Sequence, residues 1–191
     1  MISAKEAILK MEEGNRKYIT QKTGGGDISP AVRLRTCRNG QQPYAIVIAC
    51  SDSRVIPESI FSAGIGELFT IRVAGNVIDD HQLGSIEYAV EHLGTNLVVV
   101  MGHTGCGAVE AAIHHEPSGF IKYITDEISL AIGEEKDPYR ASCLNVMHSI
   151  RQISDALDIN NLRHGKDPAV IGAMYHIDDG HVEFLHDCIW L

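Results

Sequence analysis

The sequence predicts one α/β domain built on a mostly parallel β-sheet. Four short runs are largely apolar rather than alternating, as is typical of parallel strands buried on both faces; they are 44–49, 68–73, 97–101 and 169–175. Segments with apolar residues at helical spacing lie between them, and this alternation is the pattern of an α/β fold. The 191 residues suffice for one domain with a sizeable core and are short for two, and the sequence has no evident linker or internal repeat.

The N-terminal segment, residues 1–26, is predicted to be a helical arm. Ser3 and Glu6 have the spacing of a capping box, and apolar residues then recur at helical spacing, at Ala4, Ala7, Ile8, Met11 and Tyr18. The triple glycine 24–26 breaks the helix. The apolar face of the arm needs a cover, either the chain's own core or a partner subunit. We expect residues 27–191 to form the core.

The core elements follow in chain order. After the second strand, Leu83, Ile86, Val90 and Leu93 share one helical face that Gly94 closes. After the third strand, residues 107–115 have helical composition and stop at 116–119. A longer helical region carries apolar residues at 143, 146, 147, 150, 153 and 157. Residues 175–185 around Asp178-Asp179-Gly180 are typical of a hairpin whose second strand is 182–185.

Charge and composition exclude some partners. The net charge is −9, and a cluster of three arginines at 33, 35 and 38 is better interpreted as a solvated helix face, so we expect no nucleic-acid partner. No segment approaches the roughly 20 apolar residues of a membrane span, and the N-terminus lacks the pattern of a signal peptide. We therefore expect a cytoplasmic protein without membrane contact, whose cysteines are thiols or metal ligands rather than disulfides.

Polar side chains directly follow two of the predicted strands. Residues 50–54, Cys-Ser-Asp-Ser-Arg, follow the first strand, and residues 102–107, Gly-His-Thr-Gly-Cys-Gly, follow the third. In open α/β sheets, ligands bind beyond the carboxyl ends of the strands. Both segments are therefore expected at one edge of the sheet.

Three of these side chains are candidate metal ligands. His103 and Cys106 can reach one metal ion from a single tight turn, and Cys50 can join them from the neighbouring strand end. Two thiolates and an imidazole select zinc, and three protein ligands leave the fourth tetrahedral position open for catalysis. The other cysteines, at 37, 143 and 188, have no partner at ligand spacing and are interpreted as structural.

Asp52 and Arg54 form the second candidate pair. The planar guanidinium of Arg54 can hold the Asp52 carboxylate by two hydrogen bonds and keep it off the metal. Held in this way, Asp52 can accept a hydrogen bond from a zinc-bound hydroxide and orient it. An ordinary ion pair that closes a loop is the alternative.

These residues resemble the β-class carbonic anhydrases. The resemblance covers nearly the whole chain and rests on segments 12–16, 50–54, 66–69, 72–76, 86–90, 102–107 and the terminal hairpin. It implies a Rossmann-like subunit, one zinc ion per chain on Cys50, His103 and Cys106, and a catalytic Asp52–Arg54 pair. It also implies a homodimer or higher homo-oligomer in which the arm packs on the neighbour.

The family has two types of site. In the open type water stays on zinc, and Gln41, Phe69 and Tyr88 stand at the positions that line its apolar pocket. Gly107, which follows the candidate ligand Cys106, is assigned to the same substrate pocket. In the capped type the aspartate binds zinc, and a tryptophan stands where this chain has Val47. Arg72 matches the arginine that binds regulatory bicarbonate in the capped type, although an arginine occurs there more widely. The open type is favoured.

The resemblance implies reversible hydration of carbon dioxide to bicarbonate by zinc-bound hydroxide. Three alternatives stay open at this point: a carbonyl sulfide or carbon disulfide hydrolase of the same fold, a catalytically inactive zinc-binding protein, and an enzyme that uses Cys50 as a nucleophile.

Overall fold

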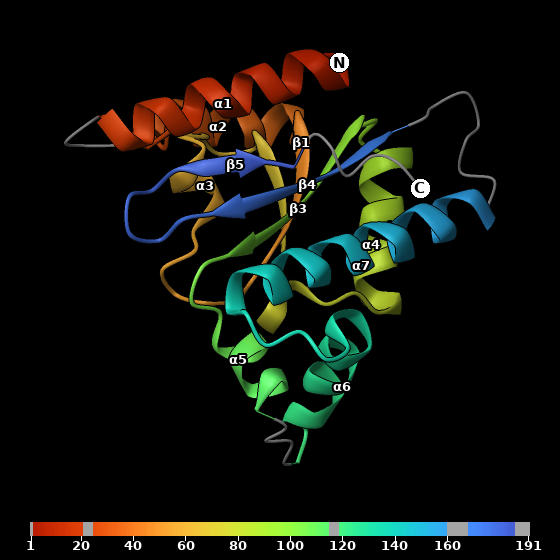
Figure 1. Ribbon diagram of the computed structural model, residues 1–191. Helices are drawn as coiled ribbons and strands as arrows, with labels where there is room; N and C mark the ends of the chain where they lie inside the picture. Colours follow the sequence, from red (N-terminus) through yellow and green to blue (C-terminus); the bar gives the residue numbers. More distant parts are fainter. Residues whose placement is uncertain (1, 21–24, 115–118, 160–167, 186–191) are drawn as a thin grey trace.

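The computed structural model describes residues 2–20, 25–114, 119–159 and 168–185 (Figure 1). The strands form a five-stranded sheet in the order β2-β1-β3-β4-β5. Their bounds are β1 Ala45–Ala49, β2 Leu68–Arg72, β3 Leu97–His103, β4 Ala169–Tyr175 and β5 Val182–Phe184. Strands β1 to β4 run parallel to one another, and β5 pairs antiparallel with β4 as the second strand of the hairpin. The predicted α/β fold with a mostly parallel sheet is confirmed.

Helices cover both faces of this sheet. On one face, α1 (Ala4–Thr20) and α3 (Pro57–Ile60) pack against side chains such as Val47 and Val99. On the other face, α4 (Asp80–Glu91) and α7 (Pro138–Ile159) pack against side chains such as Ile48 and Val100. The inner strands β1 and β3 are buried along their whole length. This explains why their sequences are apolar throughout rather than alternating.

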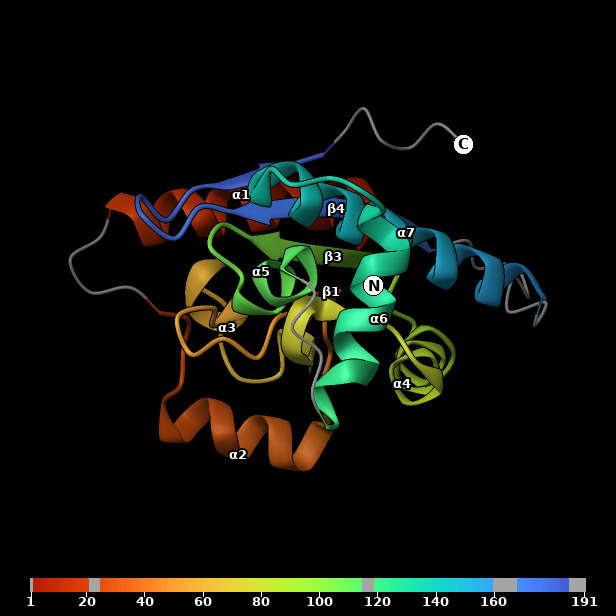
Figure 2. The same cartoon turned by 60° about the horizontal axis from the view of Figure 1, so that its bottom comes forward.

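The remaining helices lie toward the carboxyl end of β3 or apart from the sheet. α5 (Gly107–Ile113) and α6 (Ile121–Ile132) pack together beside α7, next to the 3₁₀ turn η1 (Ala74–Asn76). α2 (Pro30–Asn39) stands apart from the helices that cover the sheet (Figure 2). Its arginines 33, 35 and 38 are exposed, as a solvated helix face requires.

The N-terminal helix is covered by the chain's own core. Ala7 and Met11 are fully buried against the sheet, and the buried Asn15 side chain donates to the carbonyl oxygens of Ile60 and Gly180. Its Oδ1 accepts from the N–H of Val182. The sequence left open whether the chain's own core or a partner subunit buries the apolar face of this helix. In the structure the chain's own core buries Ala7 and Met11. Other apolar side chains of the same helix stay exposed, with Leu9 at 55% and Ile19 at 44%. Packing of the arm on a neighbouring subunit therefore stays a prediction.

Several boundaries differ from the sequence-based prediction. The helix predicted up to Gly94 begins at Asp80, behind an Asp79 capping box, and ends at Glu91. The single long helical region is two helices, α6 and α7, because Gly133 ends α6 with a positive φ of 56° and α7 begins at Pro138. The short α3 and η1 were not predicted. Cys188 lies outside the described residues.

No helix in the described ranges combines the length and the apolar character needed to cross a membrane.

Candidate metal centre

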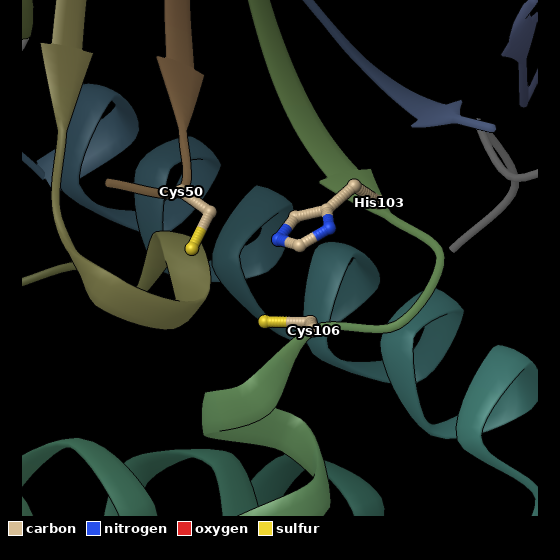
Figure 3. Close-up of side chains that lie close together, drawn as sticks. All are labelled: Cys50, His103 and Cys106. Carbon is tan, nitrogen blue, oxygen red and sulfur yellow. The ribbon is translucent and has the colours of Figure 1, made fainter. Parts of the chain in front are cut away.

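The three predicted ligands lie at one edge of the sheet. Cys50 directly follows β1, His103 is the last residue of β3, and Cys106 precedes the first residue of α5. Because Ala49 pairs with Met101 in the parallel register, the two strands deliver Cys50 and His103 to the same edge. Figure 3 shows the three side chains pointing toward one another from their separate elements.

The geometry of these side chains fits a metal ion. One ligand atom from each of Cys50, His103 and Cys106 lies within 4.8 Å of the others, and the residues are 5%, 0% and 3% exposed. His103 Nδ1 lies 2.9 Å from the Thr104 carbonyl oxygen, which assigns the proton to Nδ1. The buried Nε2 then carries a lone pair, and it has no hydrogen-bond partner in the structure as described. An unpaired buried nitrogen beside two sulfurs is the donor set of a zinc site.

The two thiols differ in acidity. The neighbouring Cys106 thiol and the His103 ring lower the pKa of Cys50, and the adjacent Cys50 thiolate and burial raise the pKa of Cys106. Cys50 also accepts from two backbone N–H groups, that of Asp52 at 3.4 Å and that of Gly75 at 3.3 Å. The arrangement therefore holds Cys50 as a thiolate, the form that binds metal.

Arg54 holds Asp52 beside this cluster. Arg54 Nε donates to Asp52 Oδ1 at 2.9 Å, and Nη2 donates to Oδ2 at 2.6 Å. The same Nη2 lies 3.2 Å from the carbonyl oxygen of Gly105, between the two ligands of the H-x-x-C turn. These hydrogen bonds from Arg54 hold the pKa of Asp52 well below its usual range. An ionised carboxylate is thus fixed next to the three ligand side chains.

Arg72 contacts the backbone of the Cys50–Asp52 turn. Its Nε donates to the carbonyl oxygen of Cys50 at 3.2 Å, and its Nη2 donates to that of Asp52 at 2.8 Å. The resemblance to the capped type of site pointed to a bicarbonate-binding arginine at this position. In the structure these two nitrogens instead brace the turn that carries Cys50 and Asp52.

The predicted pocket residues divide into two groups. Gly107 adjoins Cys106 at the start of α5, and a Cβ placed on it would meet nothing within 4 Å, so Gly107 itself faces open space. Phe69 and Tyr88 lie together, with ring centroids 6.2 Å apart. However, Phe69 pairs with Ile46, four residues before Cys50, which is about 13 Å along the strand.

Gln41 is also distant from the ligands of its own chain. It is exposed and precedes β1, whereas Cys50 follows β1, so the five-residue strand, about 16 Å long, separates them. One chain therefore does not bring Gln41, Phe69 and Tyr88 to its own metal cluster. Their role in a substrate pocket stays a prediction.

Other residues at the site were missed by the sequence reasoning. Asn145 and Ser149 of α7 are buried and contact the turn that donates to Cys50. A signal for them existed, because Ser142, Asn145 and Ser149 form a polar stripe at helical spacing beside the apolar one.

Known proteins resemble this chain in sequence and in fold. The family model of carbonic anhydrases matches residues 45–182. A carbonic anhydrase of Mycolicibacterium smegmatis is 35% identical, over 91% of this chain and 89% of the relative. The crystal structure of the β-carbonic anhydrase CafA of Aspergillus fumigatus has a TM-score of 0.70 and 28% identity, over 84% of this chain and 83% of that one.

A second solved structure is described as a tetrameric β-carbonic anhydrase from Sordaria macrospora. It has a TM-score of 0.66 and 26% identity, over 82% of this chain and 87% of that one. The family match spans most of the chain, including both segments that carry the metal-ligand candidates. We conclude that this chain belongs to the β-carbonic anhydrase family and is a carbonic anhydrase.

Proposed function

We propose that the chain binds one zinc ion through Cys50, His103 and Cys106 and uses it to interconvert carbon dioxide and bicarbonate. The observation that carries this proposal is the buried cluster of two sulfurs and one unpaired imidazole nitrogen within 4.8 Å. Zinc bound there would supply its usual chemistry, a water molecule acidified enough to attack carbon dioxide near neutral pH.

The residues around the cluster then have distinct tasks. The Asp52 carboxylate, kept ionised by Arg54, accepts a hydrogen bond from the reacting water and orients its lone pair toward the substrate. Arg54 prevents Asp52 from filling the fourth ligand position, because both carboxylate oxygens are already bonded to its guanidinium. Asp52 does not belong to the group of ligand atoms within 4.8 Å, which supports the open type of site.

Substrate access is proposed on the side of Gly107. The space beside this residue is open, and a Cβ added to Gly105 would likewise meet nothing within 4 Å. Because Phe69 and Tyr88 lie away from the cluster of their own chain, an apolar pocket that includes them needs a second subunit. We therefore propose a homodimer or a higher homo-oligomer, in line with the tetrameric relative. A cytoplasmic location stays a prediction.

The rival activities lack support. The relatives and solved structures described above are named carbonic anhydrases, and none supports a carbonyl sulfide or carbon disulfide hydrolase or an inactive protein. A nucleophilic Cys50 would need an accessible sulfur, whereas Cys50 is 5% exposed and faces Cys106 and His103.

The test combines metal analysis with a rate measurement. The purified protein should contain one zinc ion per chain and hydrate carbon dioxide in a stopped-flow assay, and removal of zinc by a chelator should abolish the activity until zinc is added back. Carbonyl sulfide should be a poor substrate in a parallel assay. Protein that hydrates carbon dioxide at full rate without zinc would contradict the proposal.

A further inference from the structure

The η1 turn presents a backbone donor to the Cys50 sulfur. Gly75 N–H lies 3.3 Å from Cys50 Sγ, in a position that needs an unusual backbone. Gly75 has a φ of 67° and the next residue, Asn76, a φ of 46°, both in the left-handed region. Glycine adopts this region freely, whereas Asn76 carries some backbone strain there, although asparagine tolerates it better than most residues. The turn therefore needs contacts from outside to keep its shape.

Helix α7 supplies these contacts. Asn145 Nδ2 donates to the Gly75 carbonyl oxygen at 2.7 Å, and Ser149 Oγ donates to the Asn76 carbonyl oxygen at 3.2 Å. Both side chains are 1% exposed, so neither carbonyl would find water in their place. These two hydrogen bonds fix the directions of the two peptide units that follow the Gly75 N–H.

Helix α6 closes the other side of the turn. A Cβ on Gly75 would lie 2.7 Å from Ile128 Cδ1 and 3.1 Å from Ala108 Cβ, so the turn is packed against side chains of α6 and α5. This packing on one side and the Cys50 sulfur on the other fix the position of the Gly75 N–H. Helices α5, α6 and α7, all distant from this turn in sequence, therefore contact the turn that carries the Gly75 N–H.

We propose that Asn145 and Ser149 are positioning residues for the metal site, which act through the Gly75–Asn76 turn to aim a backbone N–H at the Cys50 thiolate. The inference rests on the proposed zinc site. An N–H···S bond fixes the direction of the sulfur and withdraws electron density from it, so that its loss leaves the thiolate less well oriented. Outer contacts of this kind commonly change metal affinity by about 10- to 100-fold.

The test compares Asn145→Ala and Ser149→Ala with two controls. Ser142→Ala removes a hydroxyl that is also buried on α7, but among the described residues its Oγ donates to the Pro138 carbonyl oxygen of the same helix and not to the Gly75–Asn76 turn. Ser149→Thr keeps the hydroxyl. For each variant, zinc affinity is measured by competition with a chromogenic chelator, and the thiolate-to-metal charge-transfer band is recorded after substitution with Co²⁺.

We expect Asn145→Ala to weaken zinc binding by about 10- to 100-fold and to move the Co²⁺ band to longer wavelength, because the thiolate becomes more electron-rich. Ser149→Ala should change the zinc affinity and the Co²⁺ band in the same direction, but by less. The zinc affinities of the two controls should stay within about twofold of the wild type. If Asn145→Ala does not fold, as judged by circular dichroism, Ser149→Ala decides.

Folded variants with unchanged affinity and an unchanged band would overturn the inference, as would an equal shift in Ser142→Ala, which would reflect a general loosening of α7. Failure of the wild-type protein to bind zinc would contradict the proposed function instead. The two failures are therefore distinguishable.

Discussion

Arg54 and Asp52 are joined through both oxygens of the carboxylate. Nε and Nη2 of Arg54 donate to Oδ1 and Oδ2 of Asp52 at 2.9 and 2.6 Å, and the Arg54 backbone N–H adds a third hydrogen bond to Oδ1 at 2.9 Å. The side chain of Asp52 is 17% exposed and that of Arg54 is 53% exposed. The pair thus lies at the opening of the site, with the carboxylate on the inner side.

This relationship predicts the effect of removing the guanidinium. In Arg54→Ala, Asp52 loses the two side-chain hydrogen bonds that hold it, and an unpaired carboxylate beside a divalent cation gains from binding it. We expect the variant to retain its zinc, and we expect its carbon dioxide hydration rate to fall at least about tenfold. X-ray absorption should show one added oxygen ligand. Full turnover with Asp52 still off the metal would contradict this role of Arg54.

The same pair predicts a pH dependence of stability. Arg54 holds the folded pKa of Asp52 below the unfolded value of about 3.9, so the pair stabilises the fold above that pH and the contribution disappears as pH falls toward the folded pKa. The difference in free energy of unfolding between wild type and Asp52→Asn should be constant from about pH 5 to pH 8 and should shrink below about pH 4. Urea unfolding at several pH values measures it.

The control for this experiment is Asp52→Asn in the Arg54→Ala background. Both comparisons are made on protein from which a chelator has removed zinc, so that Asp52 cannot bind the metal in the Arg54→Ala background. Without the guanidinium, the pH-dependent part of the difference should then largely vanish, since Asp52 titrates near its ordinary pKa. An acid-dependent difference of the original size in that background would mean that another group shifts the pKa of Asp52.

The ligand cluster predicts zinc content. Cys106→Ser and His103→Ala each remove one of the three donor atoms that lie within 4.8 Å, and each should lower zinc occupancy at least about tenfold under competition with a chelator. Cys37→Ser is the matched control because Cys37 is a free, exposed cysteine. Full zinc content in both ligand variants, measured by elemental analysis, would refute the assignment.

The N-terminal helix predicts a loss of stability from one buried amide. Asn15→Ala leaves the carbonyl oxygens of Ile60 and Gly180 and the N–H of Val182 without their side-chain partner. Because buried polar groups without a partner are costly, the variant should lose about 3 kcal/mol of unfolding free energy, measured by urea denaturation. Lys5→Ala, exposed on the same helix, should change it by less than about 0.5 kcal/mol.

Removing the helix altogether should have a stronger effect. Deletion of residues 1–22 uncovers the sheet face against which Met11 and Ala7 are buried, so we expect aggregated or weakly associated protein in size-exclusion chromatography. A well-behaved monomer with full activity would show that the helix is dispensable.

Local patterns in the sequence were enough to predict the strands and the residues of the metal cluster. Runs such as 97–101 are apolar throughout because β3 is covered on both faces, and His103 and Cys106 are close in the chain, so a single turn brings them together. Asp52 and Arg54 are also two residues apart, and their pairing was predicted for that reason. Contacts of this kind depend on short stretches of chain, which the residue types and spacing largely determine.

The tertiary structure decided everything that depends on which elements become neighbours. It placed α1 on its own sheet, where the sequence allowed either cover, and it left Phe69 about 13 Å along the sheet from Cys50. It also brought Asn145 of α7 to the Gly75 turn, 70 residues away in the chain. A polar residue at a helical position has the same spacing whether it faces water or a buried carbonyl. Only the packing of α7 against η1 distinguishes the two, because the free-energy cost of an unpaired carbonyl arises once the helix has excluded water.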